Sequence, residues 1–314
     1  MSLLTVGSVA FDALETPFGK TDKIIGGAAT YITLSASYFT KENNLVAVVG
    51  DDFPQIMLDD LRRHGVNTDG LEIRPGEKTF FYSCQYGNDM NTRITLETQL
   101  NVMEHFNPQI PDQYQDCTYL MLGNAAPAIQ RTVIERLRQR PKLIVLDTMN
   151  LWIEIANPDL KRLLPMVDVL VINDEEARQL THERALVTAA AKIRELGPQT
   201  VIIKKGEHGA LLFHDGRVFS APALPLAQVF DPTGAGDTFA GGFIGYLART
   251  DDVTFENLKR AIIYGSAMAS FCVEKFGAER ILNLTPGEIQ ERVQAFVELS
   301  AFDLKTGTDA LTKQ

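Results

Sequence analysis

The most informative stretch of this chain is Asp231-Pro232-Thr233-Gly234-Ala235-Gly236-Asp237-Thr238-Phe239-Ala240-Gly241-Gly242. Gly234, Ala235 and Gly236 carry almost no side chain, so their backbone N–H groups are free to surround an anion. The segment from Thr238 to Arg249 is predicted to be a helix, which places these amides at its partly positive N-terminus. The stretch therefore predicts an anion-binding cradle, which we define as the backbone of residues 234–236.

A carboxylate follows this cradle directly, at Asp237. An acid beside an anion site suits the transfer of a phosphoryl group to an alcohol, because the amides hold the charge and the acid receives the proton. We expect the helix terminus to lower the pKa of Asp237, which makes it a weak base whose main work is to orient the attacking hydroxyl. Asp237 is thus the candidate catalytic residue.

The alternative is structural: residues 231–234 form a turn and Asp237 is a helix cap. A cap requires neither the two spaced glycines nor the small residues at 240–242, which let the helix approach its neighbour closely. We favour the functional interpretation, because the several elements fit one mechanism together.

The overall composition is that of a soluble enzyme. The chain has 314 residues and a formal net charge of −10, which argues against nucleic acid or an anionic membrane as the main partner. Three scattered cysteines, Cys84, Cys117 and Cys272, lack metal-ligand spacing and are expected to be buried thiols in a reducing compartment. Because no apolar run could span a membrane and no signal peptide is recognisable, we expect a cytoplasmic protein.

Short apolar runs alternate with helical stretches along most of the chain. This alternation predicts an α/β fold with a mostly parallel central sheet and helices on both faces, and a largely helical C-terminal part after Asp237. The predicted core strands are residues 3–9, 45–49, 119–122, 143–146, 169–172 and 201–203.

One region interrupts the alternation. Residues 79–85 and 92–97 alternate in polarity and are rich in aromatic and β-branched residues, with Asn88-Asp89 as a turn between them. With Ile24 and Ile25 they are expected to form a small sheet apart from the core; the alternative is an ordinary edge hairpin. The predicted division is a main domain of residues 1–11, 26–72 and 98–300, a small β lid of residues 12–25 and 73–97, and a tail of residues 301–314.

The stretch 231–242 resembles the C-terminal signature of the ribokinase-like (PfkB-type) carbohydrate kinases, which include sugar kinases and adenosine-type nucleoside kinases. The resemblance extends from about Leu4 to Pro286. It implies a ribokinase-like fold, a β lid that closes over the substrate, ATP as co-substrate and Mg²⁺ as cofactor. Neither a Walker A loop nor a G-x-G-x-x-G fingerprint is present.

The resemblance also implies an acceptor site near the N-terminus. Asp12 matches an aspartate that bonds the hydroxyls of a sugar, although a turn-forming role is the alternative. Gly26-Gly27 matches a double glycine that packs against the sugar. Tyr31 stands where relatives usually carry Asn, so it keeps a hydrogen-bonding group and adds a ring. Arg93, in the predicted lid, is expected to reach the transferring phosphate when the lid shuts.

Two further segments are expected to bind the nucleotide. Asn173 and Glu176 match a motif linked to magnesium and the phosphates, with Glu176 acting through water; compensation of a helix dipole is the alternative. Lys204, Gly206 and Gly209 lie in a glycine-rich turn that borders the nucleotide in relatives, although turn lysines are also commonly solvated.

Two smaller expectations complete the analysis. Asp231, Thr233 and Gly277 fall where some relatives bind a monovalent cation, so we expect K⁺ dependence. Aromatic residues of the lid are expected to stack on a base, to pack the lid itself, or to meet a second lid in a homodimer; they are Phe80, Phe81, Tyr82 and Tyr86.

The sequence therefore predicts an ATP-dependent kinase that transfers the γ-phosphoryl group to a hydroxymethyl group. Its acceptor is a free sugar or the ribose of a nucleoside, and Tyr31 with the lid aromatics favours a nucleoside slightly. A non-catalytic sensor of nucleotide or sugar on the same fold is the second class, and the presence of Asp237 with its amide cradle argues against it.

Overall fold

The computed structural model describes residues 1–302, so the predicted tail lies outside the described residues from position 303 onward. A nine-stranded sheet runs through the molecule in the order β14-β13-β12-β11-β10-β9-β1-β5-β6. Strands β12 to β6 are parallel, and β13 and β14 join as an antiparallel hairpin at one edge. The strands are β1 (Leu3–Val6), β5 (Asn43–Gly50), β6 (Val66–Arg74), β9 (Tyr119–Leu122), β10 (Leu143–Asp147), β11 (Val169–Asn173), β12 (Thr200–Lys204), β13 (Ala210–His214) and β14 (Arg217–Ala221).

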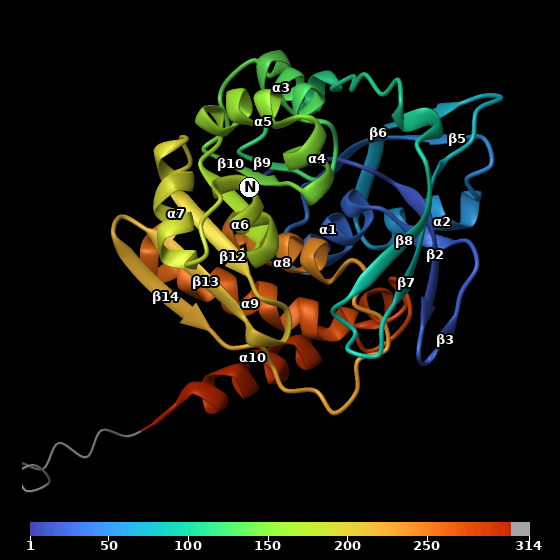
Figure 1. Cartoon of the computed structure of the whole chain (residues 1–314). Coiled ribbons are helices and arrows are strands. Elements are labelled where there is room, and N and C mark those ends of the chain that lie inside the picture. The colour runs from blue at the N-terminus through green and yellow to red at the C-terminus, as the bar shows by residue number, and fades with distance from the viewer. Residues whose placement is uncertain (303–314) are drawn as a thin grey trace, which may run out of the picture.

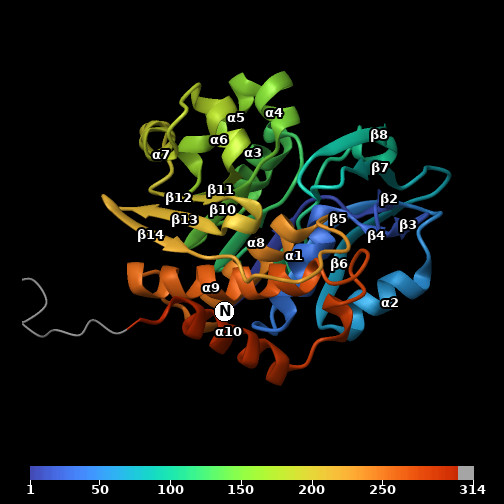
Figure 2. The same cartoon turned by 60° about the horizontal axis from the view of Figure 1, so that its bottom comes forward.

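Helices cover both faces of this sheet, because successive strand residues point to opposite sides and both sides are apolar (Figure 2). One face packs on α1 (Ala28–Ser37), α2 (Gln55–Arg63), α8 (Ala235–Thr250) and α9 (Phe255–Cys272), with α10 (Pro286–Ser300) outside α9. The other packs on α3 (Pro127–Arg136), α4 (Asn150–Ile155), α5 (Asn157–Leu163), α6 (Asp174–Thr181) and α7 (Leu186–Glu195). The predicted α/β fold is confirmed.

Helices α1 and α8 lie unusually close together, as the small residues of the motif predicted. A Cβ added at Gly241 would collide with the carbonyl oxygen of Ile32, and one at Gly245 would lie 2.8 Å from the Cα of Ala36. This close approach holds the N-terminal turn of α8 against the start of α1. The anion-binding cradle at the start of α8 and the predicted acceptor residues at the start of α1 are therefore held next to each other.

A second, smaller sheet stands apart from the first (Figure 1), and we call it the lid. It contains β2 (Ala10–Thr16), β3 (Gly19–Lys20), β4 (Ile24–Gly26), β7 (Phe80–Tyr86) and β8 (Arg93–Gln99). Strand β2 pairs in parallel with β7, which pairs with β8. The separate small sheet is thus confirmed, and the edge-hairpin alternative is wrong because β7 joins β2 rather than the central sheet.

Some elements escaped the sequence analysis. Strand β6 carries several charged residues and lies at an edge of the sheet, so it lacks the apolar run of a core strand. Short 3-10 helices are also present: η1 (Asn101–Met103), η2 (Asp112–Tyr114), η3 (Leu164–Met166), η4 (Gly206–His208) and η5 (Ile281–Asn283). The three cysteines are free and buried, as expected. Within residues 1–302, none of the helices has the length and apolar character required to cross a bilayer.

Candidate active site

The predicted cradle forms the first turn of α8, which begins at Ala235, three residues earlier than predicted. Gly234 precedes it with a φ of 73°, a left-handed conformation that favours glycine. The amide of Ala235 donates to the carbonyl of Pro232 at 3.2 Å. Among the described residues, the amides of Gly234, Gly236 and Asp237 have no such partner. These free donors at a helix N-terminus suit an anion.

Asp237 lies in this first turn, but the expectation for its pKa was wrong. Burial, together with the nearby Asp147 carboxylate, raises the pKa of Asp237 to about 7, while Lys204 opposes the shift. The loss of hydration therefore outweighs the helix terminus. A carboxylate with a pKa near neutrality is a stronger base than the sequence suggested.

Lys204 brings a positive charge to the same place from the end of β12. Its Nζ donates to Asp147 Oδ2 at 3.0 Å, and both side chains are largely buried. A Cβ added at Gly236 would lie 2.9 Å from Lys204 Nζ, so the ammonium group is directly beside the cradle. Because β10 and β12 end at the same edge of the sheet, Asp147 and Lys204 meet there.

Glu176 lies in the first turn of α6, the helix that follows β11, and it both caps this helix and carries a buried charge. Its Oε2 accepts from the Asn173 amide at 2.9 Å, and its own amide donates to Asn173 Oδ1 at 2.8 Å, which makes a capping box at the start of α6. Burial raises the pKa of Glu176 to about 7, and Lys204 opposes this. Asn173 therefore caps α6, and Glu176 belongs both to this capping box and to the buried charge cluster.

The predicted acceptor residues gather on the other side of the cradle. Asp12 lies within β2 rather than in a turn, so that alternative is wrong. Its carboxylate rests on Gly26, where any Cβ would collide with it. Burial raises the pKa of Asp12 to about 7, with the charges of Asp231 and Asp237 adding to the effect. Gly27 has a φ of 87° and starts α1.

Tyr31 is more buried than a stacking residue would be. Its side chain belongs to α1 and is 1% exposed. A Cβ at Gly234 would lie 2.5 Å from atoms of the Tyr31 ring, so the ring covers the back of that glycine. The ring is therefore not available to stack on a base.

The lid brings Arg93 toward these acids. Arg93 lies over the ring of Tyr82 at 5.7 Å, and its charge opposes the upward pKa shifts of Asp12 and Asp237. A hydrogen bond joins the lid to the motif, because the Thr233 hydroxyl donates to the Tyr86 hydroxyl at 3.0 Å. The lid thus contacts the motif just before the cradle.

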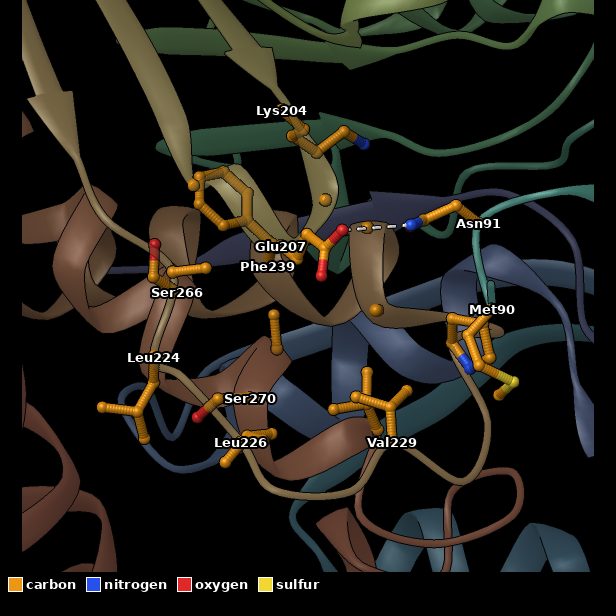
Figure 3. A pocket seen from close by; sticks show the side chains of 18 of the residues that line it. Met90, Asn91, Lys204, Glu207, Leu224, Leu226, Val229, Phe239, Ser266 and Ser270 are labelled. Carbon is orange, nitrogen blue, oxygen red and sulfur yellow. Dashed lines mark hydrogen bonds between the residues drawn. The ribbon is translucent and has the colours of Figure 1, made fainter. Parts of the chain in front are cut away.

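A cavity of about 570 Å³ opens beside the cradle. Lys204, Gly206, Gly209 and Gly236 line it, as a nucleotide site requires, whereas Asn173 does not. Figure 3 shows the lid tip closing one side, where Asn91 Nδ2 donates to Glu207 Oε1 at 3.4 Å. The apolar wall was missed, since it has no periodic pattern; it consists of Leu224, Leu226, Val229, Phe239 and Val273.

The predicted monovalent-cation residues also meet. Asp231 Oδ1 accepts from the Thr233 amide at 2.9 Å, and its Oδ2 accepts from the Gly277 amide at 2.8 Å. The Thr233 carbonyl lies beside the Cys272 thiol. Asp231 therefore fixes the loop that carries the cradle.

The residues present fit a magnesium ion held mainly by phosphates and water. Within residues 1–302, no group of three or more His, Cys, Asp or Glu side chains could ligate a metal by itself. Asp147 and Glu176 offer buried carboxylate oxygens, and the adjacent Thr148 hydroxyl is buried with no hydrogen-bond partner among residues 1–302. Such a sparse set of hard oxygen donors is typical of magnesium that binds with a nucleotide.

The chain is similar to known proteins along most of its length. The sequence profile described as "pfkB family carbohydrate kinase" matches residues 4–284. The chain is 31% identical over 255 residues to the cytidine kinase of Thermococcus kodakarensis, which covers 79% of this chain and 89% of the relative. It is 28% identical over 306 residues to a nucleoside kinase of Methanothermobacter thermautotrophicus, covering 93% and 96%.

Solved structures show the same fold. The nucleoside kinase of Methanocaldococcus jannaschii superposes with a TM-score of 0.76 at 21% identity, covering 94% of this chain and 98% of that chain. The nucleoside kinase of Burkholderia thailandensis in complex with inosine gives 0.75 at 20% identity, covering 95% and 99%.

The cluster of buried acids predicts how stability depends on pH. The pKa values of Asp12, Glu176 and Asp237 are about 7 in the folded protein, against about 4 in an unfolded chain. Between these values the folded protein binds more protons than the unfolded chain, so the stability contributed by these acids falls as pH rises and is gone above about pH 7. We expect the thermal midpoint of the ligand-free protein to fall between pH 5.5 and pH 8. Asp237→Asn should reduce that fall, and an unchanged pH profile in this variant would contradict the account.

Proposed function

The chain belongs to the pfkB family of carbohydrate kinases and is an ATP-dependent phosphotransferase, and from that membership we propose that it phosphorylates the hydroxymethyl group of a nucleoside's ribose. The observation that carries the kinase chemistry is the position of Asp237 beside the free amides at the start of α8. The choice of a nucleoside as the acceptor is argued from residues of the lid.

The lid presents a sugar-binding acid and an aromatic ring side by side. Asp12 on β2 pairs in register with Tyr82 on β7, so their side chains share one face of the lid. Arg93 lies over the Tyr82 ring on the same face. Asp12 can accept from the two ribose hydroxyls, and Tyr82, which is only partly buried, can contact the base. Relatives named cytidine kinase and nucleoside kinase support this choice over a free sugar.

In the proposed mechanism, Asp237 accepts a hydrogen bond from the ribose hydroxymethyl group and aligns its oxygen with the γ-phosphorus of ATP. The proton passes to Asp237 late in a loose transition state, so orientation contributes more than basicity. With a pKa of about 7, Asp237 can also take up that proton near neutral pH. Gly26 and Gly27 keep Asp12 and the start of α1 at the distance that an acceptor requires.

The cradle and its cations hold the charge of the transferring phosphoryl group. Free amides of Gly234 and Gly236 donate to its oxygens, and the helix terminus adds its positive end. Lys204 lies beside Gly236, where it can leave Asp147 for the phosphates. Asp147 and Glu176, the latter through water, would hold Mg²⁺, which neutralises phosphate charge when it is bound.

ATP itself is proposed to fill the cavity between the lid tip and the apolar wall. Its base would pack against Leu224, Val229 and Val273, and its phosphates would pass Gly206 and Gly209 toward the cradle. The charge of Arg93 already acts on Asp12 and Asp237, and a closed lid would let Arg93 meet the transferring phosphate and help to exclude water. A non-catalytic sensor would not need the acceptor site, the nucleotide site and the cations to meet at a catalytic base.

The proposal predicts the effect of removing the base. Wild-type protein should release ADP from ATP and Mg²⁺ when supplied with one of five ribonucleosides: cytidine, uridine, adenosine, guanosine or inosine. Asp237→Ala should reduce turnover by at least about 10³-fold, because the attacking hydroxyl loses both its orientation and its proton acceptor. Its affinity for an ATP analogue, measured by calorimetry, should change little.

A matched control is Asp159→Ala, which removes an exposed acid on α5 and should leave turnover unchanged. Near-normal turnover in Asp237→Ala would refute its role. Faster phosphorylation of D-ribose than of all five nucleosides would refute the nucleoside proposal but leave the kinase activity intact.

We further propose that K⁺ binds beside the Asp231 loop and shapes the cradle. Asp231 ties Thr233 to Gly277, so a cation bound to carbonyls of this loop would fix the peptide planes that precede Gly234. Turnover should rise several-fold when K⁺ replaces a bulky organic cation at constant ionic strength. Equal rates in the two buffers would contradict the proposal.

A homodimer through the lid is the remaining proposal. Strand β8 is an edge strand with an unpaired backbone edge, and it exposes 60% of Ile94 and 54% of Leu96. A second copy can pair its own β8 there and cover both side chains. Light scattering after gel filtration should give twice the chain mass for the wild type and the chain mass for Ile94→Glu. A wild-type protein that stays monomeric at high concentration would contradict this.

A further inference from the structure

The tip of the lid lines the cavity proposed for ATP. Asp89, Met90 and Asn91, in the turn between β7 and β8, border this cavity together with residues of the main domain. Asn91 Nδ2 donates to Glu207 Oε1 at 3.4 Å, and Asn91 Oδ1 lies 3.4 Å from the place that a Cβ of Gly206 would take. The tip therefore rests on the turn that follows β12, on the nucleotide side of the site.

Hydrogen bonds within the turn fix the backbone at Met90. Asp89 Oδ1 accepts from the Asn91 and Thr92 amides at 3.1 and 2.9 Å, and Asp89 Oδ2 accepts from the Thr92 hydroxyl at 2.6 Å. The Met90 amide donates to the Gly87 carbonyl at 3.0 Å, and Met90 has a φ of 55°. This left-handed conformation favours glycine, so methionine carries a conformational cost here that the contacts of its side chain must offset.

The Met90 side chain has two sets of neighbours. It is half-buried against the small apolar core of the lid, which consists of Leu14, Cys84 and Tyr86. It also lines the cavity, and Figure 3 shows it on the lid side, opposite Leu224. A flexible, polarisable thioether in this position suits contact with the flat face of a nucleobase.

We propose that the lid tip is part of the nucleotide site, and that Met90 packs on the base of ATP from the side opposite Leu224. This inference rests on the proposed function. The same hairpin carries Arg93, whose charge acts on Asp12 and Asp237. One hairpin thus serves both substrates, so each substrate should raise the affinity of the protein for the other by the same factor.

Met90→Ala tests this by removing the side chain beyond Cβ. Calorimetry with Mg²⁺ and the non-hydrolysable ATP analogue AMP-PNP should give an affinity about fivefold lower than in the wild type, because the base loses an apolar contact. The acceptor in these experiments is whichever of the five ribonucleosides and D-ribose the wild type phosphorylates fastest. Its affinity in the absence of nucleotide should not change. Met90→Leu, which keeps an apolar side chain of similar size, should restore the wild-type affinity for AMP-PNP.

The coupling between the two substrates is measured in the same way. In the wild type, AMP-PNP with Mg²⁺ should raise the affinity for the acceptor about fivefold or more, and Met90→Ala should lose most of this increase. Leu100→Ala is the matched control. It removes an apolar side chain, 42% exposed, directly after the end of β8 that lies away from the tip. It should change neither the two affinities nor their coupling.

The outcomes separate the two claims. If the wild type is a kinase and Met90→Ala binds AMP-PNP as tightly as the wild type does, the inference is wrong and the proposed kinase function stands. If Met90→Ala weakens binding of the acceptor alone as much as binding of AMP-PNP, Met90 only supports the lid core, which also overturns the inference. Independent binding of the two ligands to the wild type would overturn it as well. If the wild type phosphorylates none of the six acceptors, the proposed function falls, and the inference falls with it.

Discussion

More carboxylates than cationic side chains are buried around the N-terminus of α8. This excess of negative charge determines the electrostatics of the site. Lys204 and Arg93 are the positive side chains that act on the group, and burial raises the pKa of every acid in it. In the ligand-free protein, bound protons and the positive N-terminus of α8 must offset the repulsion between these carboxylates. Ions that arrive with a nucleotide would relieve it. The acids are Asp12, Asp147, Glu176, Asp231 and Asp237.

The fold assembles this group from distant parts of the chain. Strands β10, β11 and β12 end at one edge of the central sheet and deliver Asp147, Glu176 and Lys204. The close packing of α8 on α1 sets the cradle against Tyr31. The chain then leaves the central sheet after β1 to build the lid, which supplies Asp12 and Arg93. The lid and the motif also meet through the hydrogen bond between Thr233 and Tyr86.

Much of the fold and of the site could be predicted from the sequence. These predictions succeeded where residues close together in the chain determine both the local structure and its chemistry. The spaced glycines at 234–236 required a tight turn into a helix, and the apolar runs required a sheet buried on both faces. The predictions that failed were ones that depend on long-range neighbours. The pKa of Asp237 rises because burial and Asp147, 90 residues earlier, outweigh the helix terminus. The burial of Tyr31 and the apolar wall at Leu224–Val229 likewise follow from packing that no periodicity encodes.

A crystal structure with ADP, Mg²⁺, aluminium fluoride and a phosphorylated nucleoside substrate would test the central claim most directly. The account predicts that the fluoride group lies within about 3 Å of the Gly234 and Gly236 amides, and that the ribose hydroxymethyl oxygen is as close to an Asp237 carboxylate oxygen. A fluoride group bound outside the cradle, or a hydroxymethyl oxygen that contacts another base, would contradict it.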